Sequence, residues 1–150
     1  MKKIIKAKTA EDIIELGRKI GKLAFPNMVI TMEGDLGAGK TTMTKGIGES
    51  LEIRRVINSP TFTIMKTYDG RLPLYHMDVY RINNETGDEY LEEYFELDGV
   101  TVIEWANNIS EIIPDDRLEI TISIDTNNVR NIEINSNSEK YIELINKLDA

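Results

Sequence analysis

The stretch Gly34-Asp35-Leu36-Gly37-Ala38-Gly39-Lys40-Thr41-Thr42 decides the fold, because it completes the phosphate-loop pattern G-x-x-x-x-G-K-[ST]. An apolar run at residues 28–32 precedes it, and residues 42–51 can continue as a helix despite Gly46 and Gly48, which are unfavourable inside a helix. In such a strand–loop–helix unit, the backbone N–H groups of the loop and the positive end of the helix together surround an anion. The stretch therefore predicts a nucleotide-phosphate site.

The residue types within the loop suit this task. Glycine at 34, 37 and 39 accepts positive φ and has no Cβ to hold the backbone away from phosphate oxygens. Lys40 supplies a point charge for the β- and γ-phosphates, and the Thr41 hydroxyl is placed to ligate Mg²⁺. The predicted nucleotide-binding residues of the loop are Gly34, Asp35, Leu36, Gly37, Ala38, Gly39, Lys40, Thr41 and Thr42.

Length and composition favour one soluble domain over residues 1–150. The chain has 150 residues, of which 41% are hydrophobic and 29% charged, as in soluble globular proteins. No apolar run approaches the length that spans a bilayer, and the basic first residues are not followed by a signal-peptide core. The absence of cysteine fits a reducing compartment. We therefore expect a cytoplasmic protein without a membrane partner.

The net charge of −8 has the wrong sign for a protein that neutralises nucleic-acid phosphates along its surface. Direct contact of the isolated protein with RNA or DNA is therefore disfavoured. An acidic protein can still serve a nucleic-acid process by binding another protein.

The pattern along the rest of the chain predicts an alternation of strands and helices. Strands are expected at 3–8, 28–32, 61–67, 72–80, 100–103, 118–124 and 129–134. Helices are expected after Thr9, Thr41, Thr86 and Ser138, with a short helix or turn at 109–114; Thr9 is read as an N-cap with the acid Asp12 at N3, and Ser138 as the N-cap of the last helix. The first helix carries one apolar stripe at helical spacing, formed by Ile13, Leu16, Ile20 and Leu23. Asp69-Gly70 indicates a hairpin between two of these strands. The fold class is α/β: a P-loop NTPase-like three-layer domain with a mixed, partly antiparallel sheet flanked by helices.

Two strands carry polar residues that suit a catalytic site. Alternation along 74–80 places His76 and Asp78 on one face, which we expect to meet a site or solvent. The β-branched run at 100–103 ends in Glu104-Trp105, which is a Walker B-like arrangement of a carboxylate at a strand's C-terminal end. His76, the sole histidine, is expected to be a hydrogen-bonded strand residue, and Trp105 to be partly buried beside the site.

Four motifs in this order closely resemble the TsaE (YjeE-type) family over nearly the whole chain: Gly34 to Thr42, Ser59-Pro60-Thr61-Phe62, His76-Met77-Asp78-Val79-Tyr80-Arg81 and Glu104-Trp105. The family consists of small bacterial ATPases. The resemblance implies ATP binding and hydrolysis with Mg²⁺, in support of threonylcarbamoyladenosine modification at adenosine 37 of ANN-decoding tRNAs. It also implies the partner proteins TsaD and TsaB.

The resemblance further implies the roles of individual residues. Lys40 and Thr41 would hold phosphate and magnesium, 59–62 would form a switch-like segment, and Asp78 and Glu104 would be the functional carboxylates. Either carboxylate can serve the metal or orient water, so the sequence does not separate their roles. We predict Asp78 in the magnesium shell and Glu104 toward metal-bound or attacking water, with ordinary ion pairs as the alternative. Thr61 can touch nucleotide, or it can simply begin a strand.

Three other readings compete with an ATPase. Asn146-Lys147-Leu148-Asp149 matches the guanine-recognition pattern of a small GTPase, but it falls on an expected helix. A small-molecule kinase would need an arginine-rich lid, which the sequence does not show. A non-catalytic binding module controlled by nucleotide would use Lys40 and Glu104 for docking instead of turnover. No arginine finger is evident within the motifs, and Arg81 is the nearest candidate in sequence.

Overall fold

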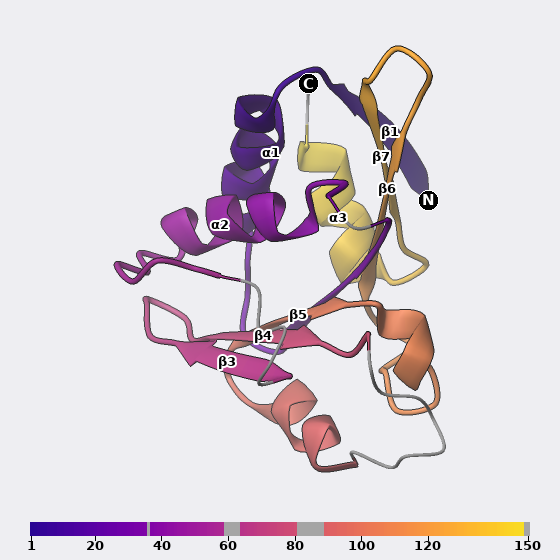
Figure 1. The fold of residues 1–150 in the computed structure, drawn as a ribbon. Coiled ribbons are helices and arrows are strands. Elements are labelled where there is room, and N and C mark those ends of the chain that lie inside the picture. Colours follow the sequence, from indigo (N-terminus) through magenta and orange to yellow (C-terminus); the bar gives the residue numbers. More distant parts are fainter. Residues whose placement is uncertain (36, 59–63, 81–88, 149–150) are drawn as a thin grey trace.

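A computed structural model describes residues 1–35, 37–58, 64–80 and 89–148 as a mixed sheet flanked by helices (Figure 1). The strands are β1 (Lys2–Ala7), β2 (Met28–Glu33), β3 (Met65–Tyr68), β4 (Leu74–Asp78), β5 (Val100–Glu104), β6 (Leu118–Ile124) and β7 (Arg130–Asn135). The α-helices are α1 (Ala10–Lys22), α2 (Lys40–Ser50) and α3 (Glu139–Lys147), and the 3₁₀ helices are η1 (Glu89–Glu96) and η2 (Ala106–Ile109). The α/β fold class predicted from the sequence is confirmed.

The sheet order among the described strands is β1-β7-β6-β2-β5-β4-β3. β2 pairs in parallel with β5 and β6, and β5 pairs in parallel with β4. The outer pairs β1–β7, β6–β7 and β3–β4 are antiparallel. Strand β2 is therefore central and buried along almost its whole length, and its C-terminal end leads directly into the glycine-rich loop.

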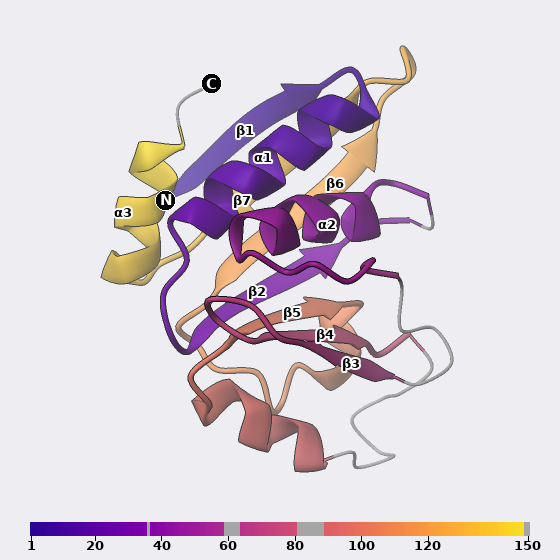
Figure 2. The ribbon, with the colours of Figure 1, turned by 90° about the vertical axis from the view of Figure 1, so that its left-hand side faces the viewer.

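Helices α1 and α2 lie across one face of the sheet, where they pack closely on each other (Figure 2). Glycines permit this approach: a Cβ at Gly17 would lie 2.3 Å from the Met43 carbonyl oxygen, and one at Gly46 would lie 2.2 Å from that of Ile14. Gly46 looked unfavourable inside a helix from the sequence alone. Its role is to let the two backbones meet.

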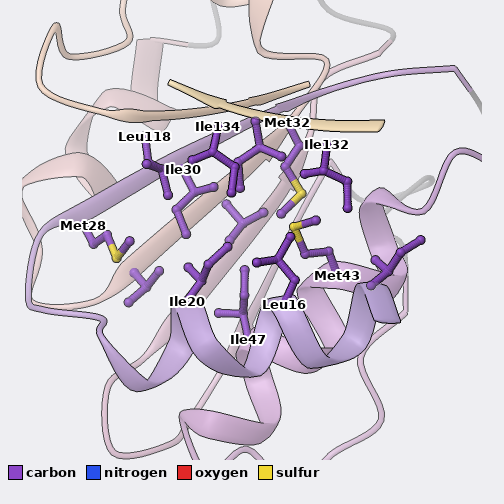
Figure 3. Close-up of a cluster of buried hydrophobic side chains, with 14 of the residues drawn as sticks. Leu16, Ile20, Met28, Ile30, Met32, Met43, Ile47, Leu118, Ile132 and Ile134 are labelled. Atoms are coloured by element: carbon purple, nitrogen blue, oxygen red, sulfur yellow. The ribbon is translucent and has the colours of Figure 1, made fainter. Parts of the chain in front are cut away.

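The larger core fills the space between these helices and the sheet (Figure 3). Leu16 and Ile20 of α1 and Met43 and Ile47 of α2 pack against β2, β6 and β7, and α3 adds Tyr141 and Leu144 to the same cluster. The Tyr141 hydroxyl also accepts the N–H of Val29 at 2.9 Å, where β2 extends past the start of β6. The amphipathic spacing predicted for α1 is therefore confirmed as its core face.

A second, smaller core covers the opposite face of the sheet. It consists of the buried residues Val29, Met77, Val79, Leu91, Phe95, Ile103, Ala106, Ile109 and Ile113. Side chains of η1 and η2 supply its outer layer. The sheet is thus covered on both faces, as the three-layer prediction required.

The termini of two helices test the capping predictions. Thr9 and Asp12 form a reciprocal capping box, with the Thr9 hydroxyl accepting the Asp12 N–H at 3.1 Å. Ser138 occupies the N-cap position of α3, but it meets the helix through its carbonyl, which accepts the N–H groups of Tyr141 and Ile142. The first prediction is confirmed in full, and the second in position only.

Several predicted boundaries are wrong. The second hairpin strand begins at Leu74, because Pro73 has no N–H to donate to the ladder. The first hairpin strand begins at Met65, and its predicted start at 61–63 lies outside the described residues. The predicted turn is present after Ile109, but the 3₁₀ helix η2 precedes it, and the helix predicted after Thr86 is the 3₁₀ helix η1. Eight residues are too few for apolar spacing to separate the two helix types.

Candidate phosphate-binding site

The glycine-rich loop connects the C-terminal end of β2 to the first turn of α2, so it lies at the edge where the parallel strands end. Gly34 and Gly39 have φ of 152° and 120°, a region that favours glycine. A Cβ at Gly34 would lie 2.6 Å from the Ile122 carbonyl oxygen, and one at Gly39 would lie 2.8 Å from Ile13 Cδ1. Gly34 is therefore required by backbone conformation and by space, whereas Gly39 is required by backbone conformation, because the end of the Ile13 side chain can move.

Lys40 is the first residue of α2, and its side chain turns back over the loop. The ammonium group donates to the Gly34 carbonyl and lies 3.7 Å from the centroid of the Trp105 ring. Burial lowers the pKa of Lys40, while the nearby carboxylates, Glu104 first, act in the opposite direction. The lysine is therefore a largely buried cation at the place where the sequence predicted phosphate binding.

The two candidate carboxylates end adjacent parallel strands. Asp78 of β4 is the register partner of Glu104 of β5, so both project from the edge that carries the loop. The Glu104 side chain is buried, and its Oε2 accepts a hydrogen bond from the Thr41 hydroxyl at 3.1 Å. Asp78 Oδ1 accepts the N–H of Tyr80 at 3.0 Å. The structure thus places the Thr41 hydroxyl in contact with the Walker B-like carboxylate of Glu104, whereas the sequence showed only that each belongs to a motif.

His76 belongs to the same cluster. Its ring is fully buried, and Nε2 lies 2.6 Å from Glu104 Oε2. The expectation of a hydrogen-bonded strand residue is confirmed. On the face of β4 that was expected to meet a site or solvent, its hydrogen-bond partner is Glu104, the second candidate carboxylate.

An aromatic pair borders the lysine on the solvent side. Trp105 follows β5 with a left-handed φ of 64° and is half-buried, as predicted. Tyr80, 55% exposed, packs against it with ring centroids 4.8 Å apart. The Trp105 ring thus contacts the Lys40 ammonium group, and Tyr80 packs on Trp105.

The oxygen donors present suit Mg²⁺. This ion keeps several waters and takes one or two protein ligands together with phosphate oxygens. The Thr41 hydroxyl and the Glu104 carboxylate already touch, with Asp78 in register beside Glu104. In the described ranges there is no group of three or more His, Cys, Asp or Glu residues able to hold a metal without further ligands. The donor set therefore fits a cation that binds with a nucleotide.

Sequence reasoning missed two residues at this edge. Glu33, the last residue of β2, accepts the N–H of Asn107 at 2.8 Å, and burial raises its pKa. Arg130 begins β7, and its guanidinium lies 3.5 Å from the Gly37 carbonyl oxygen. For Glu33, its position directly before the loop was a signal in the sequence. For Arg130 there was none, because the order of the strands in the sheet brings β7 to the loop. The predicted site residues Leu36 and Thr61, the segment 59–62 and Arg81 lie outside the described residues.

The guanine-recognition match lies elsewhere in the molecule. Asn146 and Lys147 are exposed residues of α3, as the helical spacing predicted. Lys147 lines a groove with Phe25 and Pro26, which precede β2, whereas the glycine-rich loop follows β2. Asn146 and Lys147 are therefore not placed to read a base bound at the loop, and Asp149 lies outside the described residues. Among the described helices, none is long and apolar enough to cross a bilayer.

A central parallel strand feeding a glycine-rich loop and helix, beside a strand that ends in a buried carboxylate, defines a P-loop NTPase-like α/β protein. The family model for TsaE, the threonylcarbamoyl adenosine biosynthesis protein, matches residues 7–132. The chain belongs to the TsaE family, which serves tRNA threonylcarbamoyladenosine biosynthesis.

Individual relatives agree with this assignment. The chain is 48% identical over 139 residues to the tRNA threonylcarbamoyladenosine biosynthesis protein TsaE of Bacillus subtilis, covering 92% of this chain and 88% of that one. It is 35% identical over 136 residues to the Treponema pallidum protein of the same name, with 85% and 96% covered. The crystal structure of Bacillus subtilis YdiB matches with a TM-score of 0.87 at 40% identity, covering 99% of this chain and 94% of that one.

Proposed function

We propose that this protein is an ATPase of the tRNA threonylcarbamoyladenosine pathway, with residues 1–150 acting as a single domain. It binds ATP with Mg²⁺ at the glycine-rich loop and hydrolyses it in concert with TsaD and TsaB. The observation that carries the proposal is the hydrogen bond between Thr41 of the loop and the buried Glu104. This contact joins a phosphate-loop hydroxyl to a carboxylate at a strand end, and these are the two kinds of group that hold Mg²⁺ in P-loop NTPases.

The chain's own residues account for binding. Backbone N–H groups of the loop and the N-terminal turn of α2 face the phosphates, and Lys40 exchanges the Gly34 carbonyl and the Trp105 ring for phosphate oxygens. When bound, Mg²⁺ neutralises phosphate charge and helps to align the phosphoryl group. Thr41, Asp78 and Glu104 are the residues that would hold it.

Hydrolysis then needs a group that orients the attacking water. Asp78 and Glu104 are register partners, so one can serve the magnesium shell while the other accepts a hydrogen bond from water. We assign Asp78 to the metal shell and Glu104 to metal-bound or attacking water.

No arginine finger is evident within the sequence motifs, and Arg81, the nearest candidate in sequence, lies outside the described residues. We infer that transition-state charge in the isolated protein is less fully compensated than in an enzyme with an arginine finger, so the isolated protein turns over slowly. We propose that TsaD and TsaB supply or order the missing interactions. The net charge of −8 favours a protein partner over direct contact with tRNA.

Phosphate release from ATP without an added acceptor tests this function. We expect slow release by the isolated protein and faster release with TsaD and TsaB. Transfer to a small acceptor without release to water would identify a kinase. Nucleotide-dependent binding to the partners without any turnover would identify a binding module.

A further inference from the structure

His76 has no part in the proposed chemistry, yet it is a fully buried polar residue in direct contact with Glu104. Its exposed fraction is 0%, and its Nε2 lies 2.6 Å from the same Glu104 oxygen that accepts the Thr41 hydroxyl. Its register partner in β5 is Val102, so the ring reaches two positions along the same face to Glu104. One carboxylate oxygen is thus held between a histidine and a threonine.

The two ring nitrogens have different surroundings. Nδ1 is buried without a hydrogen-bond partner in the part of the chain that the structure describes. With Glu104 ionised, a short contact to its oxygen requires the proton on Nε2, because two acceptors would repel. A proton on Nδ1 would instead be a buried donor without a partner among the described residues, which costs more than an unpaired lone pair. The geometry therefore places the proton of the Glu104 hydrogen bond on Nε2.

We propose that His76 is a positioning residue for the metal–nucleotide site. Its Nε2–H holds the Glu104 carboxylate in contact with Thr41, so that both oxygen donors are in place before nucleotide arrives. This inference rests on the proposed function, because its expected consequence is tighter binding of ATP in the presence of Mg²⁺. The hydrogen bond itself is a property of the nucleotide-free protein.

Burial makes this positioning effective. Glu104 is only 4% exposed, so few water molecules compete for its oxygens, and a hydrogen bond to a charged group in such surroundings is strong. A carboxylate without its imidazole donor would lose orientation and remain buried. Loss of such an outer contact typically weakens metal binding by about 10- to 100-fold.

The sole histidine of the chain makes the first measurement direct. In protein labelled with ¹⁵N-histidine, long-range proton–nitrogen spectra at neutral pH contain one imidazole, which needs no assignment. We expect Nε2 to be protonated and Nδ1 to be bare in the nucleotide-free protein. A proton on Nδ1 alone would overturn the proposal, whatever the protein does with ATP.

Variants test the consequence by calorimetry of ATP binding with Mg²⁺ and with a chelator. His76→Leu removes the donor, and we expect affinity with Mg²⁺ to fall by about 10- to 100-fold while affinity in chelator is unchanged. His76→Gln can present an amide N–H near the former Nε2, so it should recover most of the loss. Met77→Leu, a buried change one position along β4 in the other core, should match the wild type.

The outcomes separate the two proposals. Equal Mg²⁺-dependent affinity in wild type and His76→Leu would overturn the role of His76 while leaving the ATPase intact. A folded wild type that binds no ATP would overturn the proposed function, and the imidazole spectrum would still decide the hydrogen bond. Equal losses with and without Mg²⁺, not recovered in His76→Gln, would reduce His76 to a packing residue.

Discussion

The Thr41 hydroxyl donates to the Glu104 carboxylate at 3.1 Å, across 63 positions of sequence. Thr41 lies in the first turn of α2, and Glu104 is the last residue of β5, directly beside the central strand β2. The parallel pairing of β2 and β5 brings these two ends to one edge of the sheet. The glycine-rich loop and the Walker B-like carboxylate therefore form one candidate site only because β2 and β5 pair in parallel.

Lys40→Ala should weaken ATP binding by about 10- to 100-fold, because hydrogen bonds to charged groups contribute about 1.5–3 kcal/mol each. Calorimetric titration with ATP measures this. Lys45→Ala is the matched control, since Lys45 is an exposed residue of the same helix. A folded Lys40→Ala protein with unchanged affinity would show that the loop is not the nucleotide site.

The protein should prefer adenine to guanine nucleotides. The guanine-recognition match has Asn146 and Lys147 on α3, and Lys147 borders residues that precede β2, away from the glycine-rich loop. Competition of ATP and GTP for the site measures the preference. GTP binding at least as tight as ATP binding, and lost in Asp149→Asn, would restore the GTPase interpretation.

Gly46→Ala should destabilise the protein by about 1–3 kcal/mol, the usual cost of overpacking. The new methyl group would meet the Ile14 carbonyl at 2.2 Å, which outweighs the gain of about 1 kcal/mol that alanine brings to a helix. Urea unfolding measures the change. Lys45→Ala again serves as the control, and a stabilised Gly46→Ala protein would contradict the close contact of α1 and α2.

The stability conferred by Glu33 should fall as pH rises above 4.5. Burial raises its folded-state pKa, so between the unfolded and folded values the folded protein binds more protons, and the free energy of unfolding decreases with pH. Glu33→Gln keeps an oxygen for the Asn107 N–H but cannot ionise. We expect the variant to gain stability relative to wild type between pH 4 and pH 7 in urea titrations. A difference independent of pH would contradict the pKa shift.

The sequence predicted what local chemistry determines. The phosphate-loop spacing, the capping box at Thr9 and the carboxylate after the β5 run each depend on neighbouring residues, and each lies where it was expected. Sheet order was not predictable, because equal apolar runs can pair in many orders. The contact of Arg130 with the loop follows from that order, since β7 reaches this edge through β6.

The second feature that the sequence did not predict is the complete burial of His76. Alternation along β4 suggested that His76 faces a site or solvent, but it does not reveal that β5 and both cores enclose the strand. The bond from His76 to Glu104 depends on this enclosure. Similarly, Gly46 read as a weak helix residue until α1 was placed against it.

The central claim is that Asp78 and Glu104 carry ATP turnover in an enzyme that its partners activate. The most direct test is steady-state phosphate release by wild type, Asp78→Ala and Glu104→Ala, each alone and with TsaD and TsaB, with folding checked by circular dichroism. Wild type should be slow alone and faster with the partners, and both variants should remain folded but lose the stimulated rate. A fully active Glu104→Ala protein in the assembly, or an isolated wild type as fast as the assembly, would contradict the account.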